Sequence, residues 1–387
     1  MSALPSGKRV AVVYLARKAE GEGPLRRFVD SYLRHPAAIE HSLVVIYKGF
    51  EQAKELADAR AIFATIPHTG IELSDAGFDI GAYLAAARRL EHDYLCFVNT
   101  FSEVAADGWL QALCRHASSP AVGIAGAMGS YESLHSTLKL SHKVRWLCNE
   151  AAIEYDERLD YYFDFVIAVA CKAWRARGKG ERLSWGDRLL EYAKTLGWRL
   201  RSSASARDFF QPVASGIPPD ERFEHRWGVL VSPGGYFEDY ARIRTFPNPH
   251  IRSNGFMMER RRLLELGFDA PTTKMQACLF ESGMHGVTSR LRQTGLGAVV
   301  VGKDGRGFDV QDWFRSNTYR LGDQRNLLIT DNQTRRMHEM PLGSRLTHMR
   351  LAWGDYAGAA PNDYPRLGIA LSVVSSATGS PSVLSYD

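Results

Sequence analysis

Apolar and polar positions along residues 8–130 follow two alternating periods. In residues 24–33 and 81–90 the apolar side chains fall on one stripe, as in a helix that packs on one side. Between and around these segments lie short apolar runs rich in Val and Ile, at residues 10–15, 42–47, 94–98 and 121–125. Such runs are typical of strands buried on both faces. Strands that alternate with helices predict βαβ units and a mostly parallel sheet between helices, an α/β fold.

This alternation stops near residue 134 and resumes near residue 246. The stretch 134–245 has mainly helical patterns and predicts a large helical insertion. We therefore expect a first half of an α/β domain at 1–133, its second half at 246–345, and a C-terminal extension at 346–387. In the second half, the pattern predicts a helix over 256–266, a loop over 269–277, a helix over 284–294 and a strand over 298–301.

Charge changes this picture only locally. The chain has a net charge of +5, which does not demand nucleic acid as a partner. Residues 172–207 hold ten Lys and Arg against three acids, so they suit either a solvated helix face or contact with an anionic membrane surface. No apolar run is long enough to span a bilayer, and the first residues lack a secretory pattern. We expect a cytoplasmic protein, with peripheral contact at the inner membrane face through 172–207 as an open alternative.

Other sequence features exclude several classes of function. The five cysteines form no CxxC pair, so neither a structural zinc nor a disulfide framework is expected. The chain has no GxxxxGK[ST], GxGxxG, HExxH or GxSxG motif. Nucleotide hydrolysis by a phosphate loop, hydride transfer, zinc proteolysis and the hydrolase elbow therefore lack their usual signatures.

Polar side chains gather where the strands of the first half end. In parallel α/β sheets ligands bind at the carboxyl ends of the strands, which here carry Tyr14–Arg17, Lys48 and Asn99–Glu103. The segment Asp75–Gly81 opens the next helix, where free N–H groups favour phosphate and a carboxylate such as Asp79 suits a sugar or ribose hydroxyl. The alternative is that Asp75 or Asp79 only caps that helix. Among the side chains at the edge, Glu103 alone offers a carboxylate to a hard metal ion.

A second group of candidates lies in the second half. Glu281 stands between Leu279-Phe280 and Ser282-Gly283, ahead of a predicted helix, and an acid beside apolar residues could be a general base with a raised pKa. The alternative is an acid at a helix start, favoured by the helix dipole. In a Pro-containing loop, His250, Arg252 and Asn254 could converge on a ligand, although a lone loop histidine is more often only exposed.

Five stretches together carry a resemblance to a known family: VAVVYLA, LVVIYKG, FDIGAYLAAARRLEHDYLCFVNTFSE, SNGFMMERRRLLELGFD and FESGMHGVTSRLRQTGLGAVVVG. Their order resembles the inverting glycosyltransferases of family 2 with the GT-A fold, and more closely those of the bacterial rhamnan-synthesis type. The likeness covers residues 8–130 and 250–302. It implies a GT-A, Rossmann-like, mostly parallel sheet enclosed by helices, and a nucleotide-sugar donor with a glycan or lipid-linked acceptor.

The resemblance also implies roles for particular residues. It assigns Glu281 as the base and the following residues to the donor: Tyr14, Arg17, Lys48, Asp79, Gly81, Asn99 and Thr100. It assigns to the acceptor or the donor diphosphate His250, Arg252, Asn254 and Lys274. Asn99 and Phe101 replace the two aspartates of the family's DxD cluster, so a need for Mg²⁺ or Mn²⁺ is left open, with Glu103 as its one ligand.

Two functions remain in competition. The first is a nucleotide-sugar-dependent, inverting hexosyl- or deoxyhexosyltransferase that acts in the biosynthesis of cell-surface polysaccharide or glycan. The second is a catalytically degenerate GT-A-like protein that binds a nucleotide sugar or glycan or serves as an assembly partner. The retained Glu281 favours the first, and the weakened DxD cluster favours the second.

Overall fold

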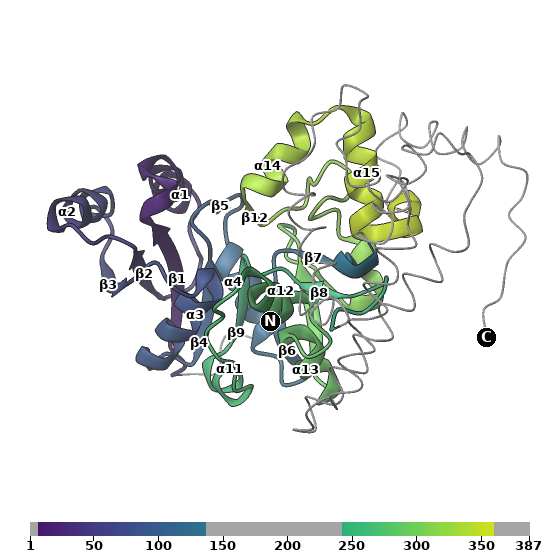
Figure 1. The fold of residues 1–387 in the computed structure, drawn as a ribbon, viewed down its shortest axis with the longest axis horizontal. Coiled ribbons are helices and arrows are strands. Elements are labelled where there is room, and N and C mark those ends of the chain that lie inside the picture. Colours follow the sequence, from purple (N-terminus) through teal and green to yellow (C-terminus); the bar gives the residue numbers. More distant parts are fainter. Residues whose placement is uncertain (1–6, 137–241, 360–387) are drawn as a thin grey trace, which may run out of the picture. The chain divides into compact units, whose positions relative to one another are not determined.

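A mixed sheet forms the centre of the computed structural model, which describes residues 7–136 and 242–359 (Figure 1). In these residues its strand order is β11-β10-β6-β9-β4-β1-β2-β3. The strands are β1 (Val10–Arg17), β2 (Ser42–Lys48), β3 (His68–Leu73), β4 (Tyr94–Val98), β6 (Val122–Gly126), β9 (Phe256–Glu259), β10 (Gly297–Val301) and β11 (Gly307–Phe308). Strands β1 to β4 are parallel, as are β6 and β10, whereas β9 runs antiparallel to β4 and β6. The predicted α/β, mostly parallel, Rossmann-like sheet is confirmed.

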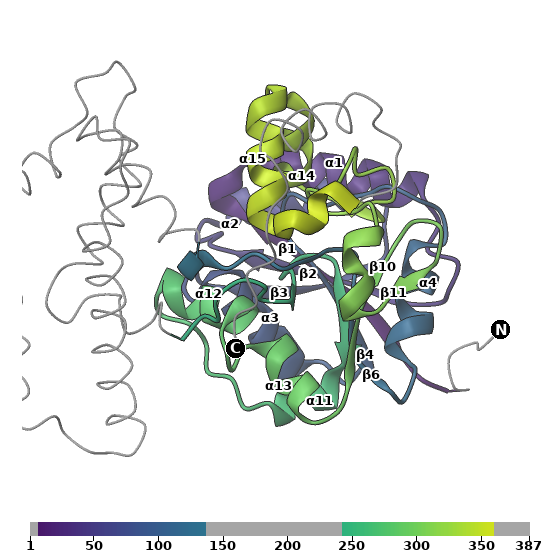
Figure 2. The same ribbon diagram turned by 90° about the vertical axis from the view of Figure 1, so that its right-hand side faces the viewer.

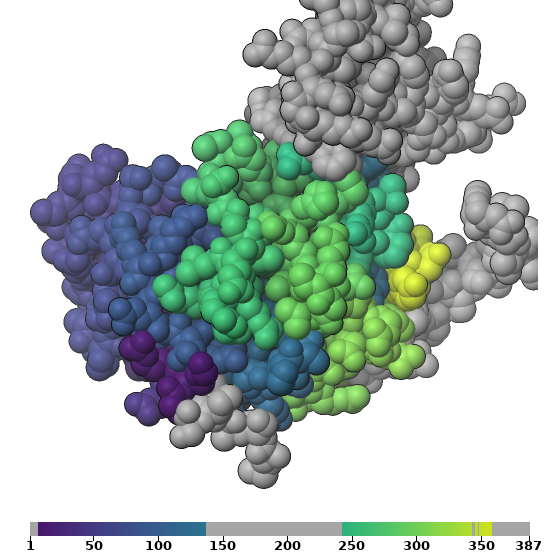
Figure 3. All heavy atoms as spheres, turned by 90° about the horizontal axis from the view of Figure 1, so that it is seen from below, coloured from purple at the N-terminus to yellow at the C-terminus, as the bar shows by residue number. Residues whose placement is uncertain are grey.

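Helices cover both faces of the sheet (Figure 2). On one face lie α1 (Glu22–Arg34), α2 (Ala53–Ile62) and α4 (Trp109–Ala117). On the other lie α3 (Phe78–Arg89), α11 (Arg260–Glu265), α12 (Lys274–Ser282) and α13 (Val287–Gln293). Figure 3 shows this second face, where the green helices α11 to α13 lie beside the blue α3. The parallel strands β1, β2 and β4 are thus buried on both sides, as their largely apolar sequences require, whereas β3 at the sheet edge is mostly exposed or half-buried.

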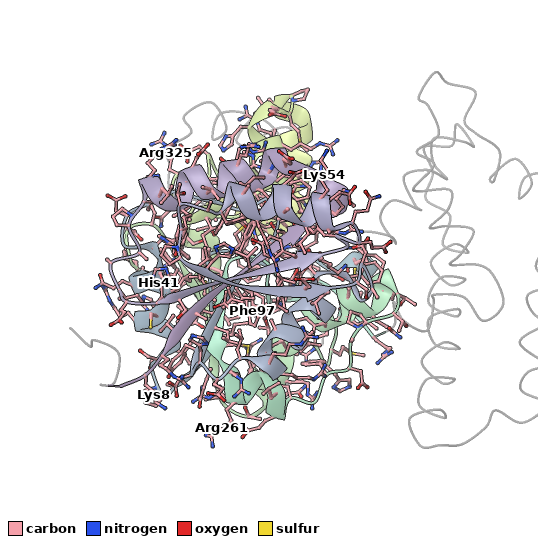
Figure 4. The ribbon with its side chains drawn as sticks, turned by 90° about the vertical axis from the view of Figure 1, so that its left-hand side faces the viewer. Lys8, His41, Lys54, Phe97, Arg261 and Arg325 are labelled. Atoms are coloured by element: carbon pink, nitrogen blue, oxygen red, sulfur yellow. The ribbon has the colours of Figure 1, made fainter. Side chains whose placement is uncertain are left out.

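The core is aromatic on both sides of the sheet. On one side the ring of Tyr14 stacks on Phe28, with 3.7 Å between ring centroids. On the other side Phe97 packs against Tyr83 and Phe256 at 4.8 and 5.0 Å. Figure 4 shows Phe97 in the interior, whereas Lys8, Lys54 and Arg261 lie at the periphery. Full burial of a Phe side chain is worth about 1.5–3 kcal/mol, so these rings fasten both helical layers to the sheet.

Two predictions in the second half of the domain were wrong. Residues 256–266 form strand β9 followed by α11, because Phe256–Met258 are buried between two neighbouring strands before the charged residues begin. Residues 269–277 were expected to be a loop, but α12 already starts at Lys274, where Thr273 and Gln276 form a capping box. The second error places the candidate Lys274 in a loop, whereas it is the first residue of α12.

Shorter elements complete the described chain. They are β5 (Glu103–Val104) paired with β12 (Ile329–Thr330), β7 (Gly129–Ser130) paired with β8 (His250–Ile251), the 3₁₀ helices η1 (Lys18–Glu20), η2 (Val310–Arg315) and η3 (Gly354–Ala359), and the α-helices α14 (Asn332–Glu339) and α15 (Leu342–Trp353). The β5–β12 pair joins the turn after β4 to the start of α14.

The chain divides into two units, one made of 1–132 with 247–387 and the other of 133–246. The sheet belongs to the first unit. Where the chain leaves this unit and returns to it, β7 pairs with β8 and the Asn248 N–H donates to the carbonyl of Tyr131 at 2.9 Å. The expected helical insertion and the basic segment 172–207 lie outside the described residues. Among the residues described, no helix has the length and apolar character to cross a membrane.

Candidate functional site

The carboxyl ends of β1 and β2 are joined by an ion cluster. Arg17, the last residue of β1, binds both carboxylate oxygens of Asp75, with Nε–Oδ1 at 2.8 Å and Nη2–Oδ2 at 2.9 Å. Lys48 ends β2, is 1% exposed, and places its Nζ 2.9 Å from Oδ1 of Asp75. The hydrogen bond from Arg17 and the charges of both cations hold the pKa of Asp75 far below its usual range. Asp75 therefore does not cap the helix that follows.

The start of α3 carries Asp79 next to this cluster. The helix is capped by Gly77 in a left-handed conformation, without a side-chain cap, so the alternative that Asp79 is the cap is also wrong. Burial raises the pKa of Asp79, while Lys274 and Lys48 pull it down. Lys274 reaches over from α12, with its Nζ 5.9 Å from the ring centroid of Phe78. Gly81 follows in the first turn, where a Cβ would lie 3.7 Å from Ala270 and Pro271.

Two donor-site candidates are buried under this edge instead of lining it. Tyr14 is fully buried, and its hydroxyl donates to the carbonyl of Thr100 at 2.9 Å. Thr100 is 3% exposed, and its hydroxyl donates to the carbonyl of Leu15 at 2.7 Å. These two bonds tie the ends of β1 and β4 together, so both residues support the edge from below.

The turn after β4 is held by Asn254, which lies just before β9. The side-chain Oδ1 of Asn254 accepts from the Asn99 N–H at 2.9 Å and from the Ser102 hydroxyl at 2.7 Å. Oδ1 of Asn99 in turn accepts from the N–H of Phe101 and the hydroxyl of Ser102. Asn254 is 4% exposed and its amide points to Asp331 at 3.4 Å. Asn254 therefore braces the turn and does not converge with His250 and Arg252.

The side chains of this turn do not fit a divalent metal. Oε1 of Glu103 already accepts from Arg27 at 3.0 Å and from Arg335 at 2.8 Å. The Asn99 oxygen is used inside the turn, and Phe101 has no oxygen in its side chain. Within residues 7–136 and 242–359, no group of three or more His, Cys, Asp or Glu side chains could hold an ion. Hard cations need several free oxygens, which the side chains of this turn do not offer.

Glu281 lies ahead of helix α13, as expected, but it is itself in the last turn of α12, which was not expected. Its Oε1 is 2.8 Å from Nη1 of Arg252 and its Oε2 accepts from the Ser253 N–H at 2.6 Å. A helix dipole disfavours an acid at this end, so the alternative of a helix-start acid is wrong. Glu281 is held in place by loop residues 252–253, which lie at least 28 positions before it in the sequence.

The expected rise in the pKa of Glu281 is also wrong. Burial by itself would raise that pKa, but Arg252, His250 and the Ser253 N–H outweigh it and lower the pKa. His250 lies 3.9 Å from Glu281 and is 3% exposed; burial lowers the pKa of its imidazole. Its Nδ1 is 2.8 Å from the carbonyl of Asn248, so in the neutral ring Nδ1–H donates and Nε2 is the acceptor, with Nη1 of Arg252 at 3.5 Å. The site thus pairs an ionised carboxylate with a neutral histidine.

Arg252 connects this acid to further charged groups. Its guanidinium lies 4.9 Å from the ring centroid of Tyr319, and Arg320 lies over the same ring at 5.0 Å. Arg320 in turn pairs with Glu132 at 3.6 Å. Sequence reasoning missed several residues of this site, because their partners are distant in the chain. They are Glu132, Ser253, Tyr319, Arg320, Asp331 and Arg335. The sequence shows only that arginines and acids are scattered along the chain, and this does not reveal which arginine pairs with which acid.

A cavity of about 720 Å³ lies at the opposite edge of the sheet, where β1 and β4 begin. Its walls include Lys8, His92, Asp93, Glu259 and Arg261. Lys8 pairs with Asp93 at 2.8 Å and Arg261 with Glu259 at 3.5 Å, so several of its charges are already matched. None of the residues expected to act in chemistry lines it.

No protein-family model and no curated protein sequence matches the chain. Solved structures similar to it include the mannosyltransferase PcManGT from Pyrobaculum calidifontis in complex with GDP-Man and Mn²⁺, at 14% identity and a TM-score of 0.26, over 37% of this chain and 43% of that one. TarS 1–349 from S. aureus is 12% identical with a TM-score of 0.25, over 30% of this chain and 34% of that one. GalNAc-T7 with UDP, GalNAc and Mn²⁺ is 19% identical with a TM-score of 0.25, over 31% of this chain and 22% of that one. The match spans less than half of each of those chains. At such TM-scores the function has to follow from the side chains of this chain.

Proposed function

We propose that the chain is a nucleotide-sugar-dependent glycosyltransferase of the GT-A type. One observation carries this proposal: the consecutive residues Ser253 and Asn254 bind Glu281 on one side and Asn99 on the other. A candidate base and a candidate donor edge are therefore joined through one dipeptide. The ion cluster of Arg17 and Lys48 lies at the same carboxyl edge of the sheet. This is the edge at which α/β sheets bind their ligands.

The chemistry proposed for this site is inverting transfer. Glu281 takes the proton from an acceptor hydroxyl, and that oxygen attacks the anomeric carbon of the donor from the face opposite the diphosphate. The carbon–oxygen bond to the diphosphate breaks, and its electron pair leaves with the diphosphate. Such a reaction asks the protein mainly for positioning and for charge complementary to the leaving group. Lys48 and Lys274 supply positive charge near Asp79, the candidate partner for a donor hydroxyl.

Nucleotide sugars that act as donors are expected to raise the melting temperature of the protein in the absence of metal. A ligand at 100 times its Kd stabilises the native state by about 2.7 kcal/mol, and a cationic edge needs no metal to attract a diphosphate. A thermal-shift screen over UDP-, GDP- and dTDP-sugars in EDTA measures this. If no nucleotide sugar shifts the transition, with EDTA or with Mn²⁺, the donor site is refuted.

Removal of divalent metal is expected to leave transfer unchanged, because Oδ1 of Asn99 and Oε1 of Glu103 already have partners and the turn has no further carboxylate. The measurement is release of nucleoside diphosphate before and after dialysis against EDTA. Activity that EDTA abolishes and Mn²⁺ restores would contradict the expectation and assign a metal to this turn.

A binding protein without transfer remains the second candidate. The observation that favours it is that both oxygens of Glu281 already have partners, Arg252 and the Ser253 N–H. A degenerate protein would be stabilised by a nucleotide sugar but would release no nucleoside diphosphate with any glycan acceptor. Surface polysaccharide assembly, with a lipid-linked or glycan acceptor, is the setting we propose for either function.

A further inference from the structure

Two arginines from separate helices meet at the turn after β4. Arg27 of α1 and Arg335 of α14 both bind Oε1 of Glu103, with donor–acceptor distances of 3.0 and 2.8 Å. Arg335 also donates from Nη1 to the carbonyl of Phe101 at 3.1 Å. Residues Asn99–Glu103 stand at the position along the chain that corresponds to the DxD cluster. In this structure that turn binds two guanidinium groups.

The two arginines at this turn share one oxygen of one carboxylate. Oε1 of Glu103 binds both guanidinium groups, and the side chains of Arg27 and Arg335 are 48% and 29% exposed. Their remaining N–H groups can therefore reach a ligand in solvent. Guanidinium groups bind phosphate oxygens in a planar, bidentate manner that a single ammonium group cannot match.

Arg335 is the better positioned of the two. It follows the first turn of α14, whose start is fixed by a capping box between Asp331 and Thr334. Asp331 is also bound by Asn254, the residue that braces Asn99. The β5–β12 pair, with Thr330 opposite Glu103, adds a second tie. Such supports keep a charged group at a fixed place, which electrostatic stabilisation of a developing charge requires.

We propose that Arg335, assisted by Arg27, binds the diphosphate of the donor at the turn after β4, whose side chains do not fit a divalent metal. This rests on the proposed glycosyl transfer. As the acceptor oxygen bonds to the anomeric carbon, the bond from that carbon to the diphosphate oxygen breaks and the diphosphate keeps the electron pair. The acceptor proton goes to Glu281. Arg335 donates N–H bonds to the diphosphate oxygens, whose negative charge grows by one in this step.

The test compares Arg335→Ala and Arg335→Lys with Glu103→Gln in the full chain, all in EDTA. The probes are UDP, GDP and dTDP for binding by calorimetry, and the corresponding nucleotide sugars for turnover. We expect Arg335→Ala to weaken nucleoside diphosphate binding at least tenfold and to lower turnover about 10²-fold, with Arg335→Lys in between. Added guanidinium chloride at millimolar concentration should restore part of the turnover of Arg335→Ala.

Glu103→Gln separates this role from a simple ion pair that fastens α14 to α1. It removes the carboxylate but keeps both arginines, so diphosphate binding should stay equal or tighten. Equal losses of melting temperature in Arg335→Ala and Glu103→Gln, with unchanged diphosphate affinity in both, would overturn the proposal and leave glycosyl transfer intact. A wild-type protein that binds no nucleoside diphosphate would overturn both. If Arg335→Ala does not fold, the affinity of Arg335→Lys and Arg27→Ala for nucleoside diphosphate is measured instead. A weaker affinity supports the proposal, and an unchanged affinity in both variants overturns it.

Discussion

Glu281→Gln is expected to lower turnover by about 10²- to 10⁴-fold, the usual contribution of a general base, with donor affinity nearly unchanged. Glutamine keeps the shape of the side chain, and its one carbonyl oxygen can still accept one of the two bonds that the carboxylate accepts, from Arg252 or from the Ser253 N–H. It cannot take a proton from the acceptor. Initial rates at saturating donor, together with donor affinity from calorimetry, measure the two effects separately.

The pH profile gives an independent check on Glu281. Its pKa is lowered, so the carboxylate is ionised throughout the neutral range and the acidic limb of the rate should fall below the ordinary Glu value of about 4.3. That limb should vanish in Glu281→Gln. Glu265→Gln is a matched control, since Glu265 is a 61% exposed acid on α11. Full activity of Glu281→Gln would refute its role as the base and make His250 the next candidate, whose Nε2 has only the long 3.5 Å contact with Arg252.

Asp75→Ala is expected to reduce the free energy of unfolding by about 2–3 kcal/mol. Removing one partner of a buried ion pair costs about 3–5 kcal/mol, because the other charge stays buried without compensation, and here the 41% exposure of Asp75 reduces that figure. The stranded group is Lys48, at 1% exposure. Lys48→Met should cost much less, since Asp75 keeps its two bonds to Arg17. Urea unfolding of the two variants measures the difference.

The stabilisation by Asp75 depends on pH. Its pKa is lowered on folding, so the contribution is complete above the unfolded value of about 4 and is lost as the pH falls below it toward the folded pKa. Asp75→Ala should lack this part of the acid destabilisation. The exposed acid Asp58 on α2 offers the control, and Asp58→Ala should stay within about 0.5 kcal/mol of wild type. Equal unfolding energies for Asp75→Ala and Lys48→Met would show that Lys48 is not stranded.

The strands β1, β2, β4 and β6 could be predicted because they are buried on both faces, whereas the edge strand β3 was missed because its polar sequence leaves only Ile71 buried. Runs such as Val10–Leu15 contain no polar residue, and a helix of that length would be too short to stand alone. Strand β9 could not be predicted in the same way. Phe256–Met258 are apolar too, but they run directly into the arginines of α11, and the joint pattern fits one helix equally well.

The sequence could predict that the candidate site lies at the carboxyl edge of the sheet, but not which side chains pair with each other there. The sequence shows that Lys48 and Asn99 follow strands, and it therefore places them together. It does not show that Asp75 pairs with Arg17, 58 positions away, or that Arg252 comes within 2.8 Å of Glu281. The pKa of Glu281 was misjudged for this reason, because its chain neighbours Leu279 and Phe280 are apolar while its spatial neighbours are cationic.

The closure of the chain at Tyr131 and Asn248 has a consequence for how this protein can vary. Because β7 pairs with β8 there, the departing and returning segments are tied within the sheet unit itself. The connection between them is closed at its base whatever its length, and a longer connection adds little closure entropy. Residues 133–246 can therefore gain, lose or exchange sequence during evolution without lengthening any connection that positions Glu281 or Asn99.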